Sequence, residues 1–273
     1  MSRGAREGEP PPAPEPLAVP VLDSHCHLDL VGGDVGAQLD AARAVGVDTV
    51  VQIGVDLESS RLSAEYAAKH DGLWAAVAIH PNEAALGAST AEVLAEIEQL
   101  AGLPQVKAIG ETGLDHFRTG EEGRGPQEES FRAHIAIAKR TGTTLVIHDR
   151  DAHDDVFRVL DEEGAPERVV FHCFSGDAAM ARACADRGWW MSFAGNVTFK
   201  NAGDLREAAA AAPADLLLVE TDAPFLTPIP YRGRPNASYL IPLTMRALAE
   251  VRGEDVDTLC AAVADNGRRA FAL

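Results

Sequence analysis

The sequence has 273 residues, a length that fits one large barrel domain or two smaller domains. With 46% hydrophobic and 24% charged residues, it has the composition of a folded globular protein, which excludes a disordered chain. Its 24 basic and 42 acidic residues give a net charge of −18, which excludes a protein that holds nucleic acid mainly by covering phosphates with Lys and Arg. A phosphate-ester substrate would therefore need metal ions or a local group of arginines.

The sequence shows no signal for a membrane or a secreted location. No apolar stretch approaches the roughly 18 residues of a membrane span, and the first 20 residues lack the apolar core of a secretory signal. The four cysteines are far apart and form no CxxC pair, as is typical of reduced thiols. We therefore expect a cytoplasmic protein without a membrane partner.

In chain order, a proline-rich start precedes a regular alternation of strands and helices. Residues 1–18 contain five of the sixteen prolines and predict a disordered lead-in, and residues 19–273 predict the folded domain. Short β-branched and apolar runs predict strands at residues 19–24, 49–54, 73–79, 106–110, 144–148, 169–172, 190–193 and 216–220. Stretches of helical period predict helices at residues 35–45, 59–69, 90–100, 127–141, 152–162, 178–187, 204–211, 240–251 and 255–271.

Eight strands, each followed by a helix, predict a single-domain α/β fold, the (β/α)8 TIM-like barrel. The alternative is an open doubly wound sheet. No GxGxxG or phosphate-loop pattern follows the first predicted strand, which weighs against that alternative. No linker rich in Pro, Gly or Ser interrupts the middle of the chain.

The first predicted strand ends in the sequence DSHCH, which places two histidines on one face. Residues two apart in a strand point to the same side, so His25 and His27 project together while Cys26 points away. Two imidazoles at the carboxyl end of a barrel strand form half of a metal site, although an HxH pair alone is also common in ordinary loops.

Four later strands also end in residues of metal-ligand type. In a barrel the carboxyl ends of all strands meet at one rim, so these side chains should converge. The predicted ligands are His25, His27, Glu111, His148, His172 and Asp222. The alternative is a polar rim without an ion. Six ligands are too many for one tetrahedral ion with an open position, so we expect two divalent ions that share Glu111.

The expected chemistry is hydrolysis by a hydroxide that bridges the two ions, which also polarise the phosphoryl or carbonyl oxygen under attack. One ion is assigned to His25, His27 and Asp222, and the other to His148 and His172. Asp222 and the bridging Glu111 are the predicted catalytic residues. Asp222 either accepts the proton of the attacking water or is a plain ligand. Histidine ligands favour Zn²⁺ or Mn²⁺.

Six motifs in this order resemble the TatD family of metal-dependent hydrolases within the amidohydrolase superfamily. They are VLDSHCHLD, AIHPNEA, IGETGLD, VIHDRDAHDD, FHCFSG and LLVETDAPFL, and the resemblance covers the chain from about residue 21 onward. It implies a TIM-like barrel and a divalent-metal-dependent deoxyribonuclease, with 3′-to-5′ exonuclease action in several members, and it also allows Mg²⁺. Many superfamily relatives bridge their ions with a carboxylated lysine, whereas this chain has Glu111 at the corresponding strand end, as in the TatD branch.

Four further residues are predicted to contact substrate, with DNA single strands or 3′ ends as the expected partner. They are His80, Arg150, Ser175 and Asn196. His80 has an equal alternative as a buried hydrogen-bonding residue. Arg150 offers a planar fork for phosphate, or an ion pair with a neighbouring aspartate. Ser175 and Asn196 lie in loops that often build phosphate sites in this fold, and each is as well explained by loop capping.

Two other functions stay open at this point. The same metal centre would also hydrolyse an ester or amide carbonyl, for example in deacylation of a mischarged aminoacyl-tRNA, and the charge of −18 leaves room for this reaction. A non-catalytic scaffold with a structural metal is the third hypothesis. The predicted open position between the ligands weighs against it.

Overall fold

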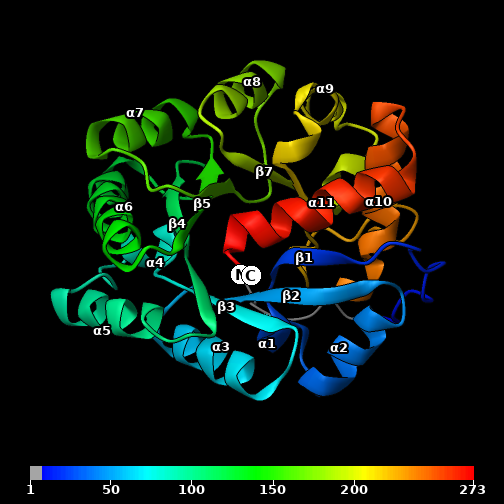
Figure 1. The fold of residues 1–273 in the computed structure, drawn as a ribbon. Coiled ribbons are helices and arrows are strands. Elements are labelled where there is room, and N and C mark those ends of the chain that lie inside the picture. The colour runs from blue at the N-terminus through cyan, green and yellow to red at the C-terminus, as the bar shows by residue number, and fades with distance from the viewer. Residues whose placement is uncertain (1–7) are drawn as a thin grey trace. The chain divides into compact units, whose positions relative to one another are not determined.

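The computed structural model describes residues 8–273 as an α/β protein whose eight strands follow one another in the order β1 to β8 in one sheet (Figure 1). The strand pairs for which a register is recorded, such as β4 with β5 and β7 with β8, are parallel. The strands are β1 Val21–Cys26, β2 Val47–Ile53, β3 Leu73–Val77, β4 Val106–Asp115, β5 Thr144–Arg150, β6 Val169–Phe171, β7 Trp190–Phe193 and β8 Leu217–Val219. This order confirms the predicted (β/α)8 barrel and excludes the doubly wound alternative, whose strand order reverses.

The described chain divides into two compact units. The first unit contains residues 1–51, 176–269 and 273, and the second contains residues 52–175 and 270–272. Among residues 8–273, none of the helices has both the length and the apolar character needed to cross a bilayer. The predicted cytoplasmic location stays a prediction.

The second unit carries β3 to β6 and the helices that connect them. Its helices are α3 Leu57–Lys69, α4 Pro81–Ala84, α5 Ala91–Ala101, α6 Glu121–Thr141 and α7 His153–Glu163. Helix α3 begins at a capping box between Asp56 and Ser59, and α6 ends at Gly142 in the left-handed conformation. In Figure 1, α5, α6 and α7 lie outside β4 and β5, so the residues of β5 from Thr144 to Ile147 are fully buried.

Strand β4 is longer than its sequence predicts, and this extension positions the site. The apolar run ends at Gly110, but the strand continues to Asp115 because it pairs with β5 along its whole length. Gly113 lies opposite His148, and Asp115 lies opposite Arg150. The polar residues that follow the apolar run therefore belong to the strand and not to a loop.

The first unit contains β1, β7 and β8 and the remaining helices. These are α1 Leu28–Val31, α2 Val35–Arg43, α8 Ala178–Asp186, η1 Gly195–Thr198, α9 Gly203–Ala211, η2 Ala214–Leu216, η3 Ser238–Leu240, α10 Ile241–Arg252 and α11 Val256–Phe271. Strand β1 is buried along its entire length, and Ser24 in it hydrogen-bonds to Ser192 of β7. Short helices such as α1 and η1 carry too few residues to show a helical period in the sequence.

The proline-rich start differs from the predicted disordered lead-in. Arg234 donates hydrogen bonds to the carbonyls of Glu9 and Pro10, and Tyr239 donates to that of Pro11. Arg246 donates to Glu15 and Pro16, and the side chain of Leu17 is buried. Proline has no N–H and leaves its carbonyl free, so a chain of this composition suits side-chain donors. Residues 1–7 lie outside the described part of the chain.

Candidate metal centre

The first unit brings together His25 and His27 with Asp222, which follows β8. The Nε2 atoms of His25 and His27 lie 3.9 and 3.6 Å from Asp222 Oδ1. The Asp222 N–H donates to the His25 carbonyl at 2.9 Å, and its φ of 50° is left-handed, a conformation that non-glycine residues adopt mainly at turns and functional sites. We call these three residues the first cluster.

The spacing of the first cluster fits a bound ion better than hydrogen bonds. Both nitrogen–oxygen distances exceed the 3.2 Å of a normal hydrogen bond. Two ligands that each lie about 2.1 Å from one tetrahedral ion are about 3.4 Å apart, close to the separations found here. Both histidines are buried and the side chain of Asp222 is 15% exposed, so the cluster has one side open to solvent.

Asp23 holds the first cluster in place, and the sequence analysis missed it. This fully buried carboxylate accepts hydrogen bonds from the N–H and the hydroxyl of Thr221, beside Asp222, and from the N–H of His25. Burial raises the pKa of Asp23 to about 6 although the hydrogen bonds from Thr221 lower it. Its position two residues before His25, on the same strand face, was the available signal.

The second unit brings together Glu111 of β4, His148 of β5 and His172 after β6, with His80 beside them. One carboxylate oxygen, Glu111 Oε1, lies 2.7 Å from His148 Nδ1, 3.0 Å from His172 Nε2 and 3.3 Å from His80 Nε2. Burial raises the pKa of Glu111, but the positive charge and hydrogen bonds of the surrounding imidazoles outweigh burial and hold that pKa well below its usual value. We call these four residues the second cluster.

His148 has a nitrogen free for an ion because Asp115 takes the other. Its Nε2 lies 3.2 Å from Asp115 Oδ2, which leaves Nδ1 directed at Glu111. Burial raises the pKa of Asp115, whereas hydrogen bonds from His148 and the Arg118 N–H bring it down to about 2. A carboxylate that orients an imidazole in this way is the common outer partner of a metal-binding histidine. Asp115 is the second residue that the sequence analysis missed, four positions after Glu111 in the same strand.

His80 has the opposite arrangement and fits a hydrogen-bond donor better than a ligand. Its Nδ1 accepts the N–H of Asn82 at 3.0 Å, so the proton of the neutral ring is on Nε2, which faces Glu111. Burial lowers the pKa of His80 despite the nearby charge of Glu111, which favours this neutral ring. His80 therefore keeps an N–H to offer, in line with its predicted role beside a substrate.

Glycine at position 113 allows β4 and β5 to approach at the second cluster. A Cβ atom built on Gly113 would lie 2.1 Å from the backbone oxygen of His148, and its φ of 137° belongs to glycine. Any other residue here would have to displace the strand that carries His148. The close contact therefore fixes the position of that imidazole relative to Glu111.

The two clusters match the predicted division of ligands between two ions. Imidazole nitrogens with one or more carboxylates form the donor set that Zn²⁺ and Mn²⁺ favour, and carboxylates with open positions also suit Mg²⁺. The first cluster and the group of His80, Glu111 and His148 each have potential ligand atoms within 4.8 Å of one another. The identity of the ions, their number and the bridging role of Glu111 stay predictions.

The other predicted substrate residues have different surroundings. The guanidinium of Arg150 lies over the ring of Phe117, 4.0 Å from its centre. The Ser175 hydroxyl donates to the Asp149 carbonyl at 2.9 Å, which supports the alternative of a loop cap. Asn196 lies in η1, where its carbonyl accepts the N–H of Phe199. Substrate contacts by these residues stay predictions.

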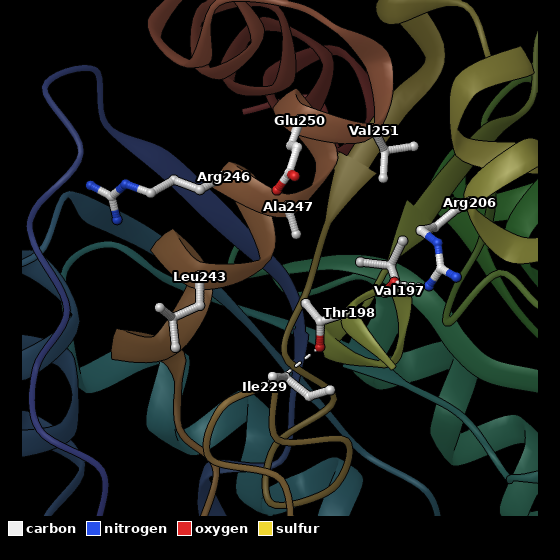
Figure 2. Close-up of a pocket in the computed structure, with 9 residues that line it drawn as sticks. All are labelled: Val197, Thr198, Arg206, Ile229, Leu243, Arg246, Ala247, Glu250 and Val251. Atoms are coloured by element: carbon white, nitrogen blue, oxygen red, sulfur yellow. Dashed lines mark hydrogen bonds between the residues drawn. The ribbon is translucent and has the colours of Figure 1, made fainter. Parts of the chain in front are cut away.

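A cavity of 530 Å³ in the first unit does not contain the first cluster. It is lined by Val197, Thr198, Arg206, Ile229, Leu243, Arg246, Ala247, Glu250 and Val251 (Figure 2). The Thr198 hydroxyl accepts the N–H of Ile229, shown as a dashed line in Figure 2, and donates to Gly195. Arg206 donates to the carbonyls of Val197 and Phe199, and Arg246 to the proline-rich start. Its polar groups thus serve the local backbone.

Comparison with known proteins shows similarity over nearly the whole chain. The family model described as TatD related DNase matches residues 22–272. An uncharacterized metal-dependent hydrolase TatD from Mycobacterium tuberculosis is 45% identical over 261 residues, covering 93% of this chain and 98% of that protein. A protein of Klebsiella pneumoniae named 3′-5′ ssDNA/RNA exonuclease TatD is 36% identical, covering 85% of this chain and 89% of its own length.

A solved structure agrees with these sequence matches. The crystal structure of YJJV, a TatD homologue from Escherichia coli, superposes with a TM-score of 0.87 at 28% identity, covering 93% of this chain and 98% of that one. The similarity covers all strands that carry the two clusters.

Proposed function

The chain belongs to the TatD-related DNase family of metal-dependent hydrolases, and from this premise we propose that it cleaves phosphodiester bonds of single-stranded DNA from the 3′ end. The observation that carries the proposal is the pair of clusters, each of which combines imidazoles with a carboxylate at the carboxyl ends of parallel strands. The relative named as a 3′-5′ exonuclease on single-stranded DNA and RNA supports this choice of substrate.

Six residues would hold the ions. His25, His27 and Asp222 would bind one, and His148 and His172 the other, with Glu111 as the predicted shared ligand. When bound, divalent ions supply Lewis-acid polarisation of the phosphodiester and lower the pKa of water at the site. The remaining chemistry belongs to side chains of the protein.

Asp222 is the group proposed to accept the proton of the attacking water. It is the more exposed of the two cluster carboxylates, at 15% against 6% for Glu111, so water reaches it more readily. Glu111 already accepts hydrogen bonds from imidazoles and has a strongly lowered pKa, which makes it a poor base. His80 donates its Nε2 proton to a phosphate oxygen or to Glu111.

The test is cleavage of a single-stranded oligonucleotide labelled at its 5′ end, in separate reactions with Mg²⁺, Mn²⁺ and Zn²⁺. We expect a ladder that shortens from the 3′ end, no cleavage with EDTA, and loss of cleavage in Asp222→Asn. The matched control is Asp215→Asn, an aspartate of the first unit outside the cluster. Cleavage that persists in EDTA, or in Asp222→Asn at saturating metal, would contradict the proposal.

A second candidate function is hydrolysis of an ester or amide carbonyl by the same clusters. The net charge of −18 favours it, because it opposes a long contact with nucleic acid backbone. Aminoacyl-tRNA and simple esters, incubated under the same metal conditions, separate the two functions. Turnover of these substrates without cleavage of DNA would replace the phosphodiesterase proposal.

A further inference from the structure

Two phenylalanine side chains are exposed, and each lies next to one of the clusters. Among the described residues, the exposed large apolar side chains include only two of the nine phenylalanines, Phe117 at 61% and Phe225 at 38%. Phe117 comes two residues after Asp115, which binds His148, and Phe225 comes three residues after Asp222. Large aromatic side chains are usually at least half buried, so their exposure beside potential metal ligands requires an explanation.

Phe117 is held in a defined place at the end of the strand pair that carries the second cluster. Asp115 lies opposite Arg150 in the register of β4 and β5, and the His116 N–H donates to the Arg150 carbonyl at 2.9 Å. The Arg150 guanidinium packs on the ring of Phe117 at 4.0 Å from its centre. Arg150 is two residues, or about 7 Å along the strand, from His148.

Phe225 has a similar position in the first unit. Its ring is 6.2 Å from the ring of His27 and nearly perpendicular to it, at 72°. The Phe225 N–H donates to the Asp222 carbonyl at 2.8 Å, and the side-chain amide of Asn236 donates to the Phe225 carbonyl. The backbone of this residue is therefore fixed while its ring stays partly open to solvent.

Exposed rings of this kind solve a problem that the net charge creates. A chain with a charge of −18 gains little affinity from a general attraction to phosphates. Stacking of a nucleobase on an aromatic ring needs no positive charge and tolerates any base sequence, because every base has a π-face. Stacking requires unpaired bases, which single strands offer and duplexes do not.

We propose that Phe117 is a stacking platform for a base of single-stranded nucleic acid, with Arg150 fixing the ring and its charge directed to the adjoining phosphate. Phe225 provides the same kind of surface beside the first cluster. The inference rests on the proposed phosphodiesterase function and adds the feature of the substrate that is recognised, an unpaired base. Bound bases would hold the strand near the clusters without sequence preference.

The experiment compares two fluorescent oligonucleotides of equal length on the metal-loaded, full-length protein. One is oligothymidylate, and the other has the same backbone with abasic sites in place of every base. Binding is measured by fluorescence anisotropy, and cleavage is followed on gels from the same samples. One stacked base should make the wild type bind oligothymidylate roughly 5- to 150-fold more tightly than the abasic strand.

Three variants assign that preference to the ring. Phe117→Ala should reduce the ratio of the two dissociation constants towards one, and Phe117→Tyr should retain it. Leu103→Ala is the matched control, since this side chain is also exposed, at 38%, but precedes the opposite end of β4, and it should keep the wild-type ratio. Phe225→Ala should lower the ratio independently.

The outcomes separate this inference from the proposed function. Equal binding of both oligonucleotides by the wild type, or an unchanged ratio in Phe117→Ala, would overturn the stacking platform, even if DNA is cleaved. A ratio that depends on Phe117, together with no cleavage by any divalent ion, would support the platform and contradict the phosphodiesterase proposal.

Discussion

The two clusters contain the same kinds of side chain in different states of contact. In the first unit, the imidazoles of His25 and His27 stay 3.9 and 3.6 Å from Asp222. In the second unit, His148 and His172 approach Glu111 to 2.7 and 3.0 Å, within hydrogen-bond distance. The first cluster is therefore spaced for an ion, whereas the second is closed by hydrogen bonds that an ion would have to replace.

This difference teaches which carboxylate is suited to which task. A carboxylate surrounded by donors is stabilised as an anion and has little tendency to take a proton, as the lowered pKa of Glu111 shows. Asp222 has no imidazole within hydrogen-bond distance in the described structure and has more contact with solvent. The comparison assigns metal binding to Glu111 and proton transfer to Asp222, and the following variants test that division.

The largest effect is expected for Asp222→Asn. An amide cannot accept the proton of the attacking water at neutral pH, so kcat should fall by roughly a hundredfold or more even at saturating metal. Steady-state kinetics over a metal titration measure this fall. Recovery of near-wild-type turnover at high metal would reduce Asp222 to a ligand and remove the contrast with Glu111.

Gly113→Ala should damage the second cluster and spare the first. The new Cβ would meet the backbone oxygen of His148 at 2.1 Å, and relief of this overlap should lower the free energy of unfolding by about 3 kcal/mol. Gly142→Ala is the control, since Gly142 also has a positive φ, of 68°, but no atom within 4 Å of its added Cβ. Equal losses in urea denaturation of the two variants would show that the contact with His148 is unimportant.

Asp115→Asn should weaken metal binding in the second cluster by roughly 10- to 100-fold, because Asp115 orients the His148 ring. Calorimetric titration with Zn²⁺ measures the affinity without reference to turnover. Asp149→Asn is matched to it, as Asp149 is also a buried carboxylate bonded to a histidine, His153, outside the cluster. If both variants bind metal as the wild type does, Asp115 has no positioning role.

The smallest predicted effect is a loss of stability in acid through His134, which joins β3 to α6. Its Nε2 accepts the Ile79 N–H at 3.1 Å, and its Nδ1 lies 2.7 Å from the Ser130 carbonyl. Burial lowers the pKa of His134 from 6.5 to about 4, so below pH 6.5 the unfolded chain binds the proton more readily. Stability is thus present above that pH and lost on acidification, by about 2 kcal/mol between pH 7 and pH 5.

Urea denaturation at several pH values checks this effect. His134→Asn should be less stable at neutral pH but should lose less on acidification than the wild type. His70→Gln, a half-buried histidine at the end of α3, is the control and should keep the wild-type slope. An unchanged slope in His134→Asn would assign the acid sensitivity to other groups.

The sequence predicted the strand order and the members of the clusters because both follow from local patterns. Each apolar run ends where a strand reaches the rim, so the residue after it, such as His148 or Asp222, is visible as a break in the pattern. Asp115 was missed because β4 continues past its apolar run, and that extension depends on pairing with β5, which no local pattern records.

Other features also depend on distant partners. The proline-rich start has the composition of a disordered segment, and its carbonyls are bound by Arg234, Tyr239 and Arg246, more than 200 residues away. The role of Asp23 depends on Thr221, which is 198 residues distant. Neither contact could be inferred from spacing along the chain.

The central claim is that both clusters hold divalent ions and that phosphodiester hydrolysis requires both. The most direct measurement titrates the metal-depleted protein with Mn²⁺ and follows, in the same samples, bound metal by mass spectrometry and cleavage of a single-stranded oligonucleotide. We predict two bound equivalents in the wild type, with cleavage rising as the second equivalent binds. His148→Ala should bind one, and Glu111→Gln should bind neither firmly if Glu111 is the shared ligand. Saturation at one equivalent with full cleavage, or two equivalents without cleavage of any phosphodiester, would contradict the claim.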